Sequence, residues 1–248
     1  MSPVPAPRFS PLAALLARAG RFADETWLRE APPLQFQTPN QIAWETRALR
    51  LRVFGETEAS AEDTLLVVPP EVNRSTIVDF APGQSLVRTL LAAGFTRVAV
   101  VEWRSANEAT RRRDIDDSVA DIHGALACLG GRAHLLGVCQ GGWESAVAAA
   151  LQPERVATLT LVAAPLDFHA GEGVLKHLCR WMPMATYRAL VARGRGRMSG
   201  ELISLGFDTL MPFERFFLKP LSVRNHVGDD EWLARYHRLN DWCRAPKD

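Results

Sequence analysis

The stretch HLLGVCQGGWESAVAAAL, residues 134–151, joins an apolar run to an alanine-rich segment through a turn rich in glycine. The apolar run predicts a buried strand over residues 134–138, and the alanine-rich end predicts a helix over residues 142–151. A strand that leads through a tight turn directly into a helix is the unit from which parallel sheets are built. The stretch therefore indicates an α/β protein.

The same order of strand and helix continues on both sides of this stretch. Buried or half-buried strands are predicted at residues 49–53, 65–68, 98–101 and 159–162. Apolar residues at helical spacing predict helices at residues 85–93 and 115–126. Alternating elements with short connections form right-handed βαβ units, so we expect a mainly parallel sheet with helices on both faces.

Cys139 occupies the turn between the predicted strand and helix, with Gly137 before it and Gly141 and Gly142 after it. This is the spacing of a nucleophile elbow, which needs small neighbours because the turn is sharp and strained. The following helix would favour the thiolate through its dipole. The alternative is a small residue in a glycine turn, and the strand–turn–helix context favours the nucleophile.

Two backbone segments would supply the oxyanion hole of such a site. The first donor would be the N–H of Gln140, directly after the nucleophile, and the second would come from the loop after an earlier strand. That loop is Pro69-Pro70-Glu71-Val72-Asn73, so the N–H of Val72 or of Asn73 is the candidate.

The composition excludes several other functions. The chain has 248 residues and a net charge of +1, which gives no basic surface for nucleic acid. The arginine clusters at 111–113 and 193–197 are interpreted as solvated surface. No apolar run is long enough to span a bilayer and no secretory leader is evident, so we expect a soluble, cytoplasmic protein. The cysteines have no metal-ligand spacing, Cys128 and Cys179 are expected to be reduced core residues, and no metal or cofactor is expected.

The pattern changes after Asp167. Residues 171–248 contain helical stretches, no further buried strand and several bulky aromatic residues: Trp181, Phe207, Phe213, Phe216, Phe217 and Trp232. We interpret this segment as a helical cap over the carboxyl ends of the strands, although a plain helical subdomain fits the composition equally well. The predicted organisation is a lead-in at 1–40, an α/β core at 41–170 and a cap at 171–248.

At this point the chain resembles a known family. The stretches PPEVNRSTIVDFAPGQSLVRTLLAAGF (69–95), VVEWR (100–104) and LLGVCQGGW (135–143) resemble the polyhydroxyalkanoate synthases, α/β-hydrolase-fold enzymes with a cysteine nucleophile in a G-x-C-x-G-G box. The stretch 202–242 is similar to their cap region. The resemblance covers roughly residues 40–245. Trp143 departs from the small residue or threonine that is usual after the glycine pair, and Gln140 is closer to some depolymerase-like relatives.

The resemblance implies a mechanism and partners. A histidine would deprotonate Cys139, which would attack the thioester of a 3-hydroxyacyl-coenzyme A and pass the acyl group to a growing polyester chain. A homodimer or a second synthase subunit, and association with polyester granules, are the implied partners. The alternatives are a cysteine-nucleophile hydrolase, acting as a polyester depolymerase or thioesterase, and a non-catalytic protein that binds granules or a partner.

The base and acid of a triad are missing from their expected places. In this fold they follow the nucleophile on later strands, and no strand with such a residue is predicted after residue 162. The candidate local pairs are His226 with Asp229 or Asp230 and His237 with Asp241, and we interpret both as structural. His169, two residues after Asp167, follows the strand next to the elbow strand and is therefore closer, but we interpret it as a loop residue. His123 and His134 are also expected to be structural, and His177 has no evident acid partner. We therefore expect the C-terminal strands of the fold to be absent, as in a truncated enzyme or a natural remnant with an exposed sheet edge.

Overall fold

The computed structural model describes residues 11–29, 33–210 and 213–244. Contacts within the chain group them into two units. An α/β unit contains residues 34–204, and a helical unit combines the N-terminal helix with residues 205–243. The chain passes from one unit to the other within α7 (Gly200–Leu210). The three-part division predicted from the sequence stays a prediction.

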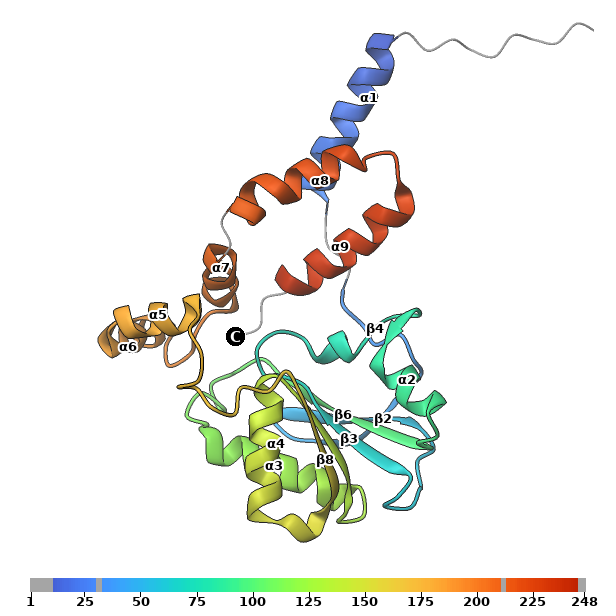
Figure 1. Ribbon diagram of the computed structural model, residues 1–248, viewed down its shortest axis with the longest axis vertical. Coiled ribbons are helices and arrows are strands. Elements are labelled where there is room, and N and C mark those ends of the chain that lie inside the picture. Colours follow the sequence, from blue (N-terminus) through green and yellow to red (C-terminus); the bar gives the residue numbers. More distant parts are fainter. Residues whose placement is uncertain (1–10, 30–32, 211–212, 245–248) are drawn as a thin grey trace, which may run out of the picture. The chain divides into compact units, whose positions relative to one another are not determined.

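The α/β unit is built on a six-stranded sheet (Figure 1). The spatial order is β1-β2-β6-β3-β7-β8, so the strands lie in the order first, second, fourth, third, fifth and sixth along the chain. β2 is antiparallel to both neighbours, whereas the pairs from β6 to β8 are parallel. The strands are β1 (Gln41–Glu45), β2 (Leu49–Gly55), β3 (Thr64–Val68), β6 (Arg97–Trp103), β7 (Ala133–Val138) and β8 (Val156–Val162).

This arrangement confirms the predicted α/β-hydrolase fold, with a mainly parallel sheet. In the described residues β8 is the last strand, and helices follow it, in agreement with the prediction. Those helices begin with α5 (Val174–Trp181) and α6 (Met184–Arg193).

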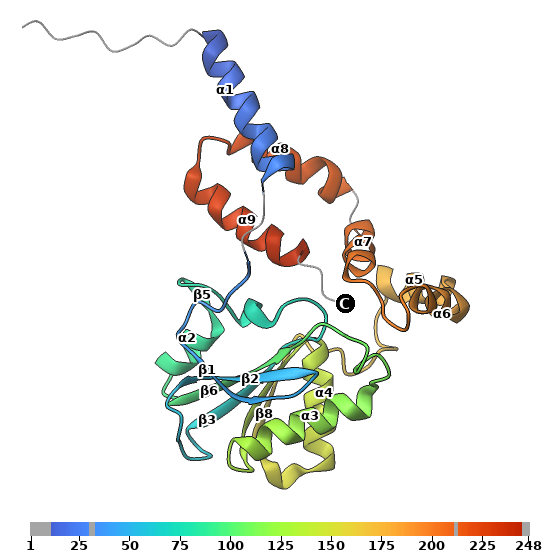
Figure 2. The same cartoon turned by 180° about the vertical axis from the view of Figure 1, so that it is seen from behind.

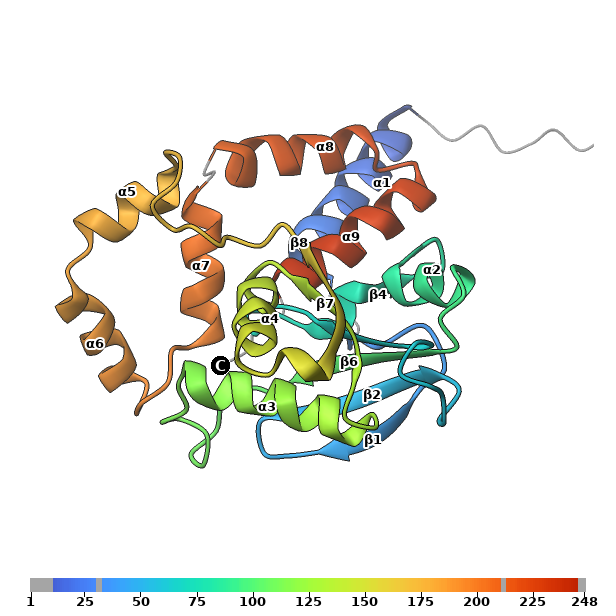
Figure 3. The same cartoon turned by 60° about the horizontal axis from the view of Figure 1, so that its bottom comes forward.

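Helices cover both faces of the sheet, as Figures 2 and 3 show. Because alternate residues of a strand point to opposite faces, the consecutive residues of β3 enter two different cores. Leu66 and Val68 pack with α3 (Ile115–Cys128) and α4 (Gln140–Leu151). Leu65 and Val67 pack on the opposite face with α2 (Leu86–Ala92). The run Leu65–Val68 is uniformly apolar because both of its faces are buried.

The structure adds elements that the sequence pattern did not predict. The edge strand β1 is mostly exposed and therefore lacks an apolar signature. A short hairpin of β4 (Asp79–Ala81) and β5 (Gln84–Ser85) precedes α2. Two short helical turns, η2 (Ser75–Val78) and η3 (Pro153–Arg155), complete the unit.

Cys128 is exposed, so its predicted place in the core is wrong. The buried face of α3 carries Val119, Ile122 and Leu126, and Cys128 lies off this face near the end of the helix. The side chain of Cys179 lies outside the described residues, as do those of Phe207 and Phe216. Trp181, Phe213 and Phe217 are strongly exposed.

The helical unit is held together by contacts between segments far apart in the sequence. It contains α1 (Pro11–Ala23), η1 (Asp24–Leu28), η4 (Glu214–Leu218), α8 (Lys219–Asn225) and α9 (Asp230–Arg244). Arg29 donates two hydrogen bonds of 2.7 Å to the carboxylate of the buried Asp241. Arg21 forms an ion pair with Asp230. None of the helices that the structure describes is long and apolar enough to cross a bilayer.

Candidate active site

Cys139 lies in the turn between β7 and α4, in the position predicted for it. Its backbone has φ 52° and ψ −117°, a positive φ that non-glycine residues rarely adopt. Such strain is maintained only where the surrounding structure enforces it. Here the N–H of Cys139 donates a 2.8 Å hydrogen bond to the carbonyl of Val162, at the end of the neighbouring strand. The residue itself is exposed and its thiol is free.

The three glycines around Cys139 are required by close packing. A Cβ at Gly137 would lie 2.5 Å from the carbonyl oxygen of Gly141, and a Cβ at Gly141 would lie 2.2 Å from the carbonyl oxygen of Val68. A Cβ at Gly142 would lie 2.5 Å from the Cβ of Ala164. Strand, turn and helix therefore approach more closely than any larger residue would allow, which is the packing that a sharp elbow needs.

Gln140 and Val72, the residues of the predicted oxyanion hole, lie close together. Gln140 begins α4, and backbone N–H groups in a first helical turn have no partner within the helix. The N–H of Val72 donates to Oε1 of the Gln140 side chain at 3.4 Å. Asn73 has a φ of 74°, so the loop turns sharply at this point. The structure thus brings the loop after β3 to the beginning of α4.

Glu144 is a buried carboxyl that the sequence analysis did not single out. It lies one turn along α4 from Gln140 and is 1% exposed. Nε2 of Gln140 donates to its Oε1 at 3.0 Å, while its Oε2 has no hydrogen-bond partner among the described residues. Burial, and secondarily the charge of Glu71, raise the pKa of Glu144 to about 7. The only sequence signal was a charged residue on the inward side of an alanine-rich helix.

The histidines of the α/β unit contact groups other than Cys139. His123 bonds the carbonyl of Ala148 at 2.9 Å, and His134 bonds Oγ1 of Thr158 at 2.7 Å. His169 is strongly exposed, with Nδ1 3.8 Å from Asp167. His177 lies 3.2 Å from a carboxylate oxygen of Glu172, so the statement that it has no acid partner is wrong. This partner lies in the loop just before α5, five residues earlier in the chain.

The side chains of the two histidines in the helical unit contact groups other than the aspartates considered as their candidate partners. The ring of His226 stacks on Trp232 at 4.2 Å, and its Nδ1 bonds the carbonyl of Ser222. His237 is buried, and its Nε2 lies 2.7 Å from Oε2 of Glu25 without aligned hydrogen-bond geometry. Burial and the nearby Arg29 guanidinium lower the pKa of His237. Asp241 is bound by Arg29 instead.

A cavity of about 390 Å³ lies at the carboxyl ends of the strands, next to the elbow. Val72 and Gln140 line it, together with Trp103 at the end of β6. The segment after α6 closes another side with Gly196, Arg197, Met198 and Ile203. Ligands of open parallel sheets bind beyond the carboxyl ends of the strands, so this is the expected position for a binding site.

The fold, together with the strained Cys139 between β7 and α4, defines the class of protein: this is an α/β-hydrolase-fold protein. No protein-family model matches the chain. It is 31% identical over 214 residues to a poly(3-hydroxyalkanoate) polymerase subunit from Haloferax mediterranei, a match covering 83% of the chain and 43% of the relative. Subunits of the same name from Synechocystis sp. and Allochromatium vinosum are 28% and 26% identical, again over 83% of the chain, which covers 56% and 59% of them.

Over most of its length the chain is thus similar to poly(3-hydroxyalkanoate) polymerase subunits, and it spans about half the length of the curated relatives it matches. Among solved structures, a probable hydrolytic enzyme from Pseudomonas aeruginosa is 18% identical with a TM-score of 0.45, covering 85% of this chain and 68% of that one.

Proposed function

We propose that this chain carries the acyl-accepting half of a polyhydroxyalkanoate synthase-type acyltransferase, with Cys139 as the nucleophile. The observation that carries the proposal is the backbone of Cys139, which is held at a positive φ with an exposed thiol at the carboxyl end of β7. A strained backbone that presents a reactive side chain is characteristic of a nucleophile elbow.

The proposed substrate is the thioester of a 3-hydroxyacyl-coenzyme A. Sγ of Cys139 attacks the thioester carbonyl carbon, and the negative charge that develops on the carbonyl oxygen is stabilised by the N–H groups of Gln140 and of Val72 or Asn73. The bond from carbon to the sulfur of coenzyme A breaks, and coenzyme A leaves as the thiol with the proton that Cys139 lost. The product is a thioester on Cys139, whose acyl group stays transferable to the hydroxyl of the next monomer.

We assign the base that deprotonates Cys139 to a group other than the described histidines of this chain. No histidine of the described residues bonds Sγ of Cys139, and the polar neighbour of the elbow is the Gln140–Glu144 pair. A synthase subunit, a second copy of this chain or a polyester granule surface is the proposed setting in which the full reaction proceeds.

The test is to mix the protein with 3-hydroxybutyryl-coenzyme A and follow released thiol together with the intact mass. We expect a single acyl adduct that is absent in Cys139→Ala. Cys128→Ala is the matched control, because Cys128 is also an exposed free thiol but lies at the end of α3. It should form the adduct as the native chain does.

The alternatives predict different results in the same experiment. Thiol release that depends on Cys139 but yields free acid and no adduct or polymer would favour a hydrolase. Neither adduct nor release, in the presence or absence of a synthase subunit, would contradict the enzymatic proposal and favour a binding protein.

A further inference from the structure

The cavity beside the elbow has a strongly basic lining. Four arginines border it, Arg104, Arg111, Arg113 and Arg197, whereas Glu71 is the only acidic residue among those that line it in the described chain. The sequence alone predicts solvated surface for the arginine clusters at 111–113 and 193–197. The structure instead brings members of both clusters together around one cavity with Arg104.

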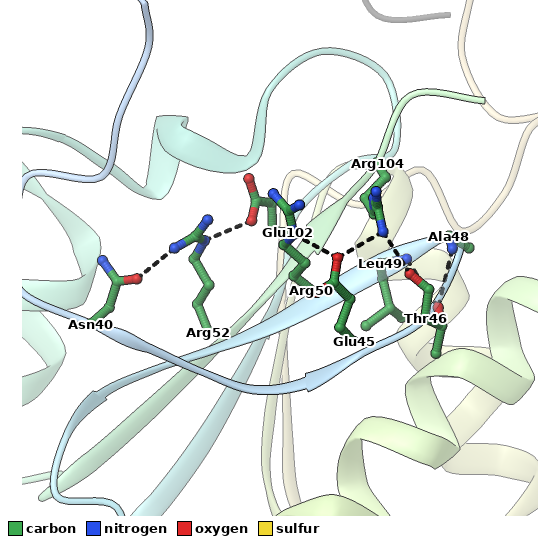
Figure 4. A network of polar contacts seen from close by, with 9 residues as sticks. All are labelled: Asn40, Glu45, Thr46, Ala48, Leu49, Arg50, Arg52, Glu102 and Arg104. Atoms are coloured by element: carbon green, nitrogen blue, oxygen red, sulfur yellow. Dashed lines mark hydrogen bonds and ion pairs between the residues drawn. The ribbon is translucent and has the colours of Figure 1, made fainter. Parts of the chain in front are cut away.

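Contacts from outside the cavity position these guanidinium groups. Nη1 of Arg104 donates to Oε1 of Glu45 at 2.7 Å and to the carbonyl of Thr46 at 3.0 Å, as Figure 4 shows. Nη2 of Arg113 bonds Asp121. Since a guanidinium has five N–H donors, each of these two retains donors beyond its supporting contact.

The remaining two arginines join the loop after β6 to the segment that follows α6. Nη1 of Arg197 donates to the carbonyl of Ala106 at 3.2 Å, and Nη1 of Arg111 lies 3.4 Å from the carbonyl of Arg195. Nη2 of Arg111 lies 3.1 Å from a carboxylate oxygen of Glu108. Hydrogen bonds therefore connect the two segments that carry these arginines, the loop after β6 and the segment after α6.

Pre-positioned arginines suit phosphate groups, which they bind through pairs of parallel hydrogen bonds. A volume of about 390 Å³ is far larger than one phosphate ion needs and falls in the range of small-molecule sites. Met198 and Ile203 add an apolar wall. The lining thus matches a ligand with several phosphates and an organic body, and a single inorganic anion would leave most of it unfilled.

We propose that this arginine-lined cavity binds the phosphorylated nucleotide end of coenzyme A. The inference rests on the proposed function, because a thioester held here would extend past Val72 and Gln140, which line the cavity, toward Cys139. Its phosphoanhydride and its 3′-phosphate contact the arginines, and the pantetheine arm leads to the elbow.

Calorimetric titration of the full-length Cys139→Ala protein tests the site without turnover. The ligands are coenzyme A, dephospho-coenzyme A, adenosine 3′,5′-bisphosphate, pantetheine, inorganic pyrophosphate and vesicles containing phosphatidylglycerol. We expect coenzyme A and the bisphosphate to bind, dephospho-coenzyme A to bind about tenfold more weakly, and pantetheine not to bind measurably. Raising the salt from about 50 to about 500 mM should weaken coenzyme A binding several-fold.

Variants identify the cavity as the binding site. Arg111→Gln and Arg197→Gln should each weaken coenzyme A binding about tenfold, whereas Arg112→Gln, a neighbouring exposed arginine that does not line the cavity, should leave it unchanged. Glu71→Gln removes the acidic group of the lining and should strengthen binding. A gain of affinity cannot result from misfolding, so this variant keeps the test decisive if an arginine variant unfolds.

Equal affinities in Arg111→Gln, Arg197→Gln and Arg112→Gln, or equal binding of pantetheine and coenzyme A, would overturn the inference. If pyrophosphate or the vesicles bind saturably and coenzyme A does not bind, the inference is overturned as well, in favour of a simple anion site or a lipid site. Failure of the proposed function is separate. Arginine-dependent coenzyme A binding without an adduct on Cys139 would contradict only the acyl transfer, and an adduct that forms equally in the arginine variants would contradict only this site.

Discussion

The side chain of Gln140 donates a hydrogen bond from Nε2 to Oε1 of Glu144 at 3.0 Å. The other end of the same amide accepts from the N–H of Val72 at 3.4 Å. Gln140 thus connects a buried carboxyl to the loop that contains the proposed second oxyanion donor. The amide donor favours the ionised form of Glu144, but burial has the larger effect and keeps the pKa of this carboxyl at about 7.

Glu144→Gln should stabilise the protein at alkaline pH. A carboxyl whose pKa is raised on folding holds a proton that the unfolded chain has already lost, so the free energy of unfolding falls as the pH rises from about 4.5 to 7. Above pH 7 the buried charge therefore lowers the free energy of unfolding by up to about 3 kcal/mol. Urea unfolding at pH 8 should show Glu144→Gln to be more stable by up to that amount.

At pH 4.5 the advantage of Glu144→Gln should disappear, since the native carboxyl is then protonated. Glu154→Gln is the control, because Glu154 is exposed. Its replacement should change the free energy of unfolding neither at pH 8 nor at pH 4.5. A stability difference that is independent of pH would contradict the assignment of a raised pKa to Glu144.

Gly141→Ala should destabilise the protein and remove acyl-adduct formation. The added Cβ would lie 2.2 Å from the carbonyl oxygen of Val68 and 2.7 Å from that of Pro69, so α4 must move away from the end of β3. Such overpacking costs about 1–3 kcal/mol. Thermal unfolding and intact mass after incubation with 3-hydroxybutyryl-coenzyme A measure the two effects. Gly83→Ala is the control, because nothing lies within 4 Å of its added Cβ, and an equal loss in both variants would argue against a special role for the elbow.

The elbow and the fold around it were predictable because the signals are local. A strand buried on both faces must be continuously apolar, as Leu65–Val68 is, and a turn without room for Cβ atoms must be glycine, as at Gly137 and Gly141. Both requirements restrict the residue types at these positions, so they can be recognised in the amino-acid sequence. The predicted strands and helices of the α/β core therefore correspond to elements of the structure.

Features that depend on tertiary contacts left no such record. The edge strand β1 is largely exposed and lacks an apolar pattern, and Cys128 has apolar neighbours in sequence but lies outside the buried face of α3. The basic cavity joins Arg111 and Arg197, which are 86 positions apart, and neither cluster alone indicated a site. Helical spacing makes His237 the candidate partner of Asp241, but the residue that binds Asp241 is Arg29, which is distant in the chain.

Arg97 is a further residue whose role appears only in the structure. It is 7% exposed, and its guanidinium donates to Oγ1 of Thr64 and to the carbonyls of Thr57, Ala59 and Leu129 at 2.8–3.1 Å. It thereby joins the loop after β2, the start of β3 and the end of α3 around the start of β6, with no carboxylate among its partners in the described chain.

Arg97→Met should cost about 3 kcal/mol of unfolding free energy, because four acceptors lose charge-assisted hydrogen bonds and those of Thr64 and Leu129 are buried. The urea midpoint measures the loss, and Arg132→Met, at an exposed arginine near the start of β7, should change it little. A loss below about 1 kcal/mol would show that water replaces the guanidinium.

The two edges of the sheet differ in their protection against pairing with another chain. β1 has a register irregularity between Ile42 and Trp44, and Glu45 beside it pairs with Arg50 and Arg104. Both a bulge and charged residues discourage a further strand. β8 has seven uncharged residues, VATLTLV, and its Leu159 and Val162 are 37% and 43% exposed.

We therefore expect this chain to self-associate through β8 in a concentration-dependent manner. Thr160→Lys places a charge in the middle of this edge and should keep the protein monomeric at concentrations where the native chain forms larger species. Light scattering coupled to size-exclusion chromatography over a concentration series measures the difference. Thr209→Lys, at an exposed threonine of α7, adds the same charge elsewhere and should associate like the native chain. If both lysine variants dissociate equally, net charge rather than the β8 edge controls association.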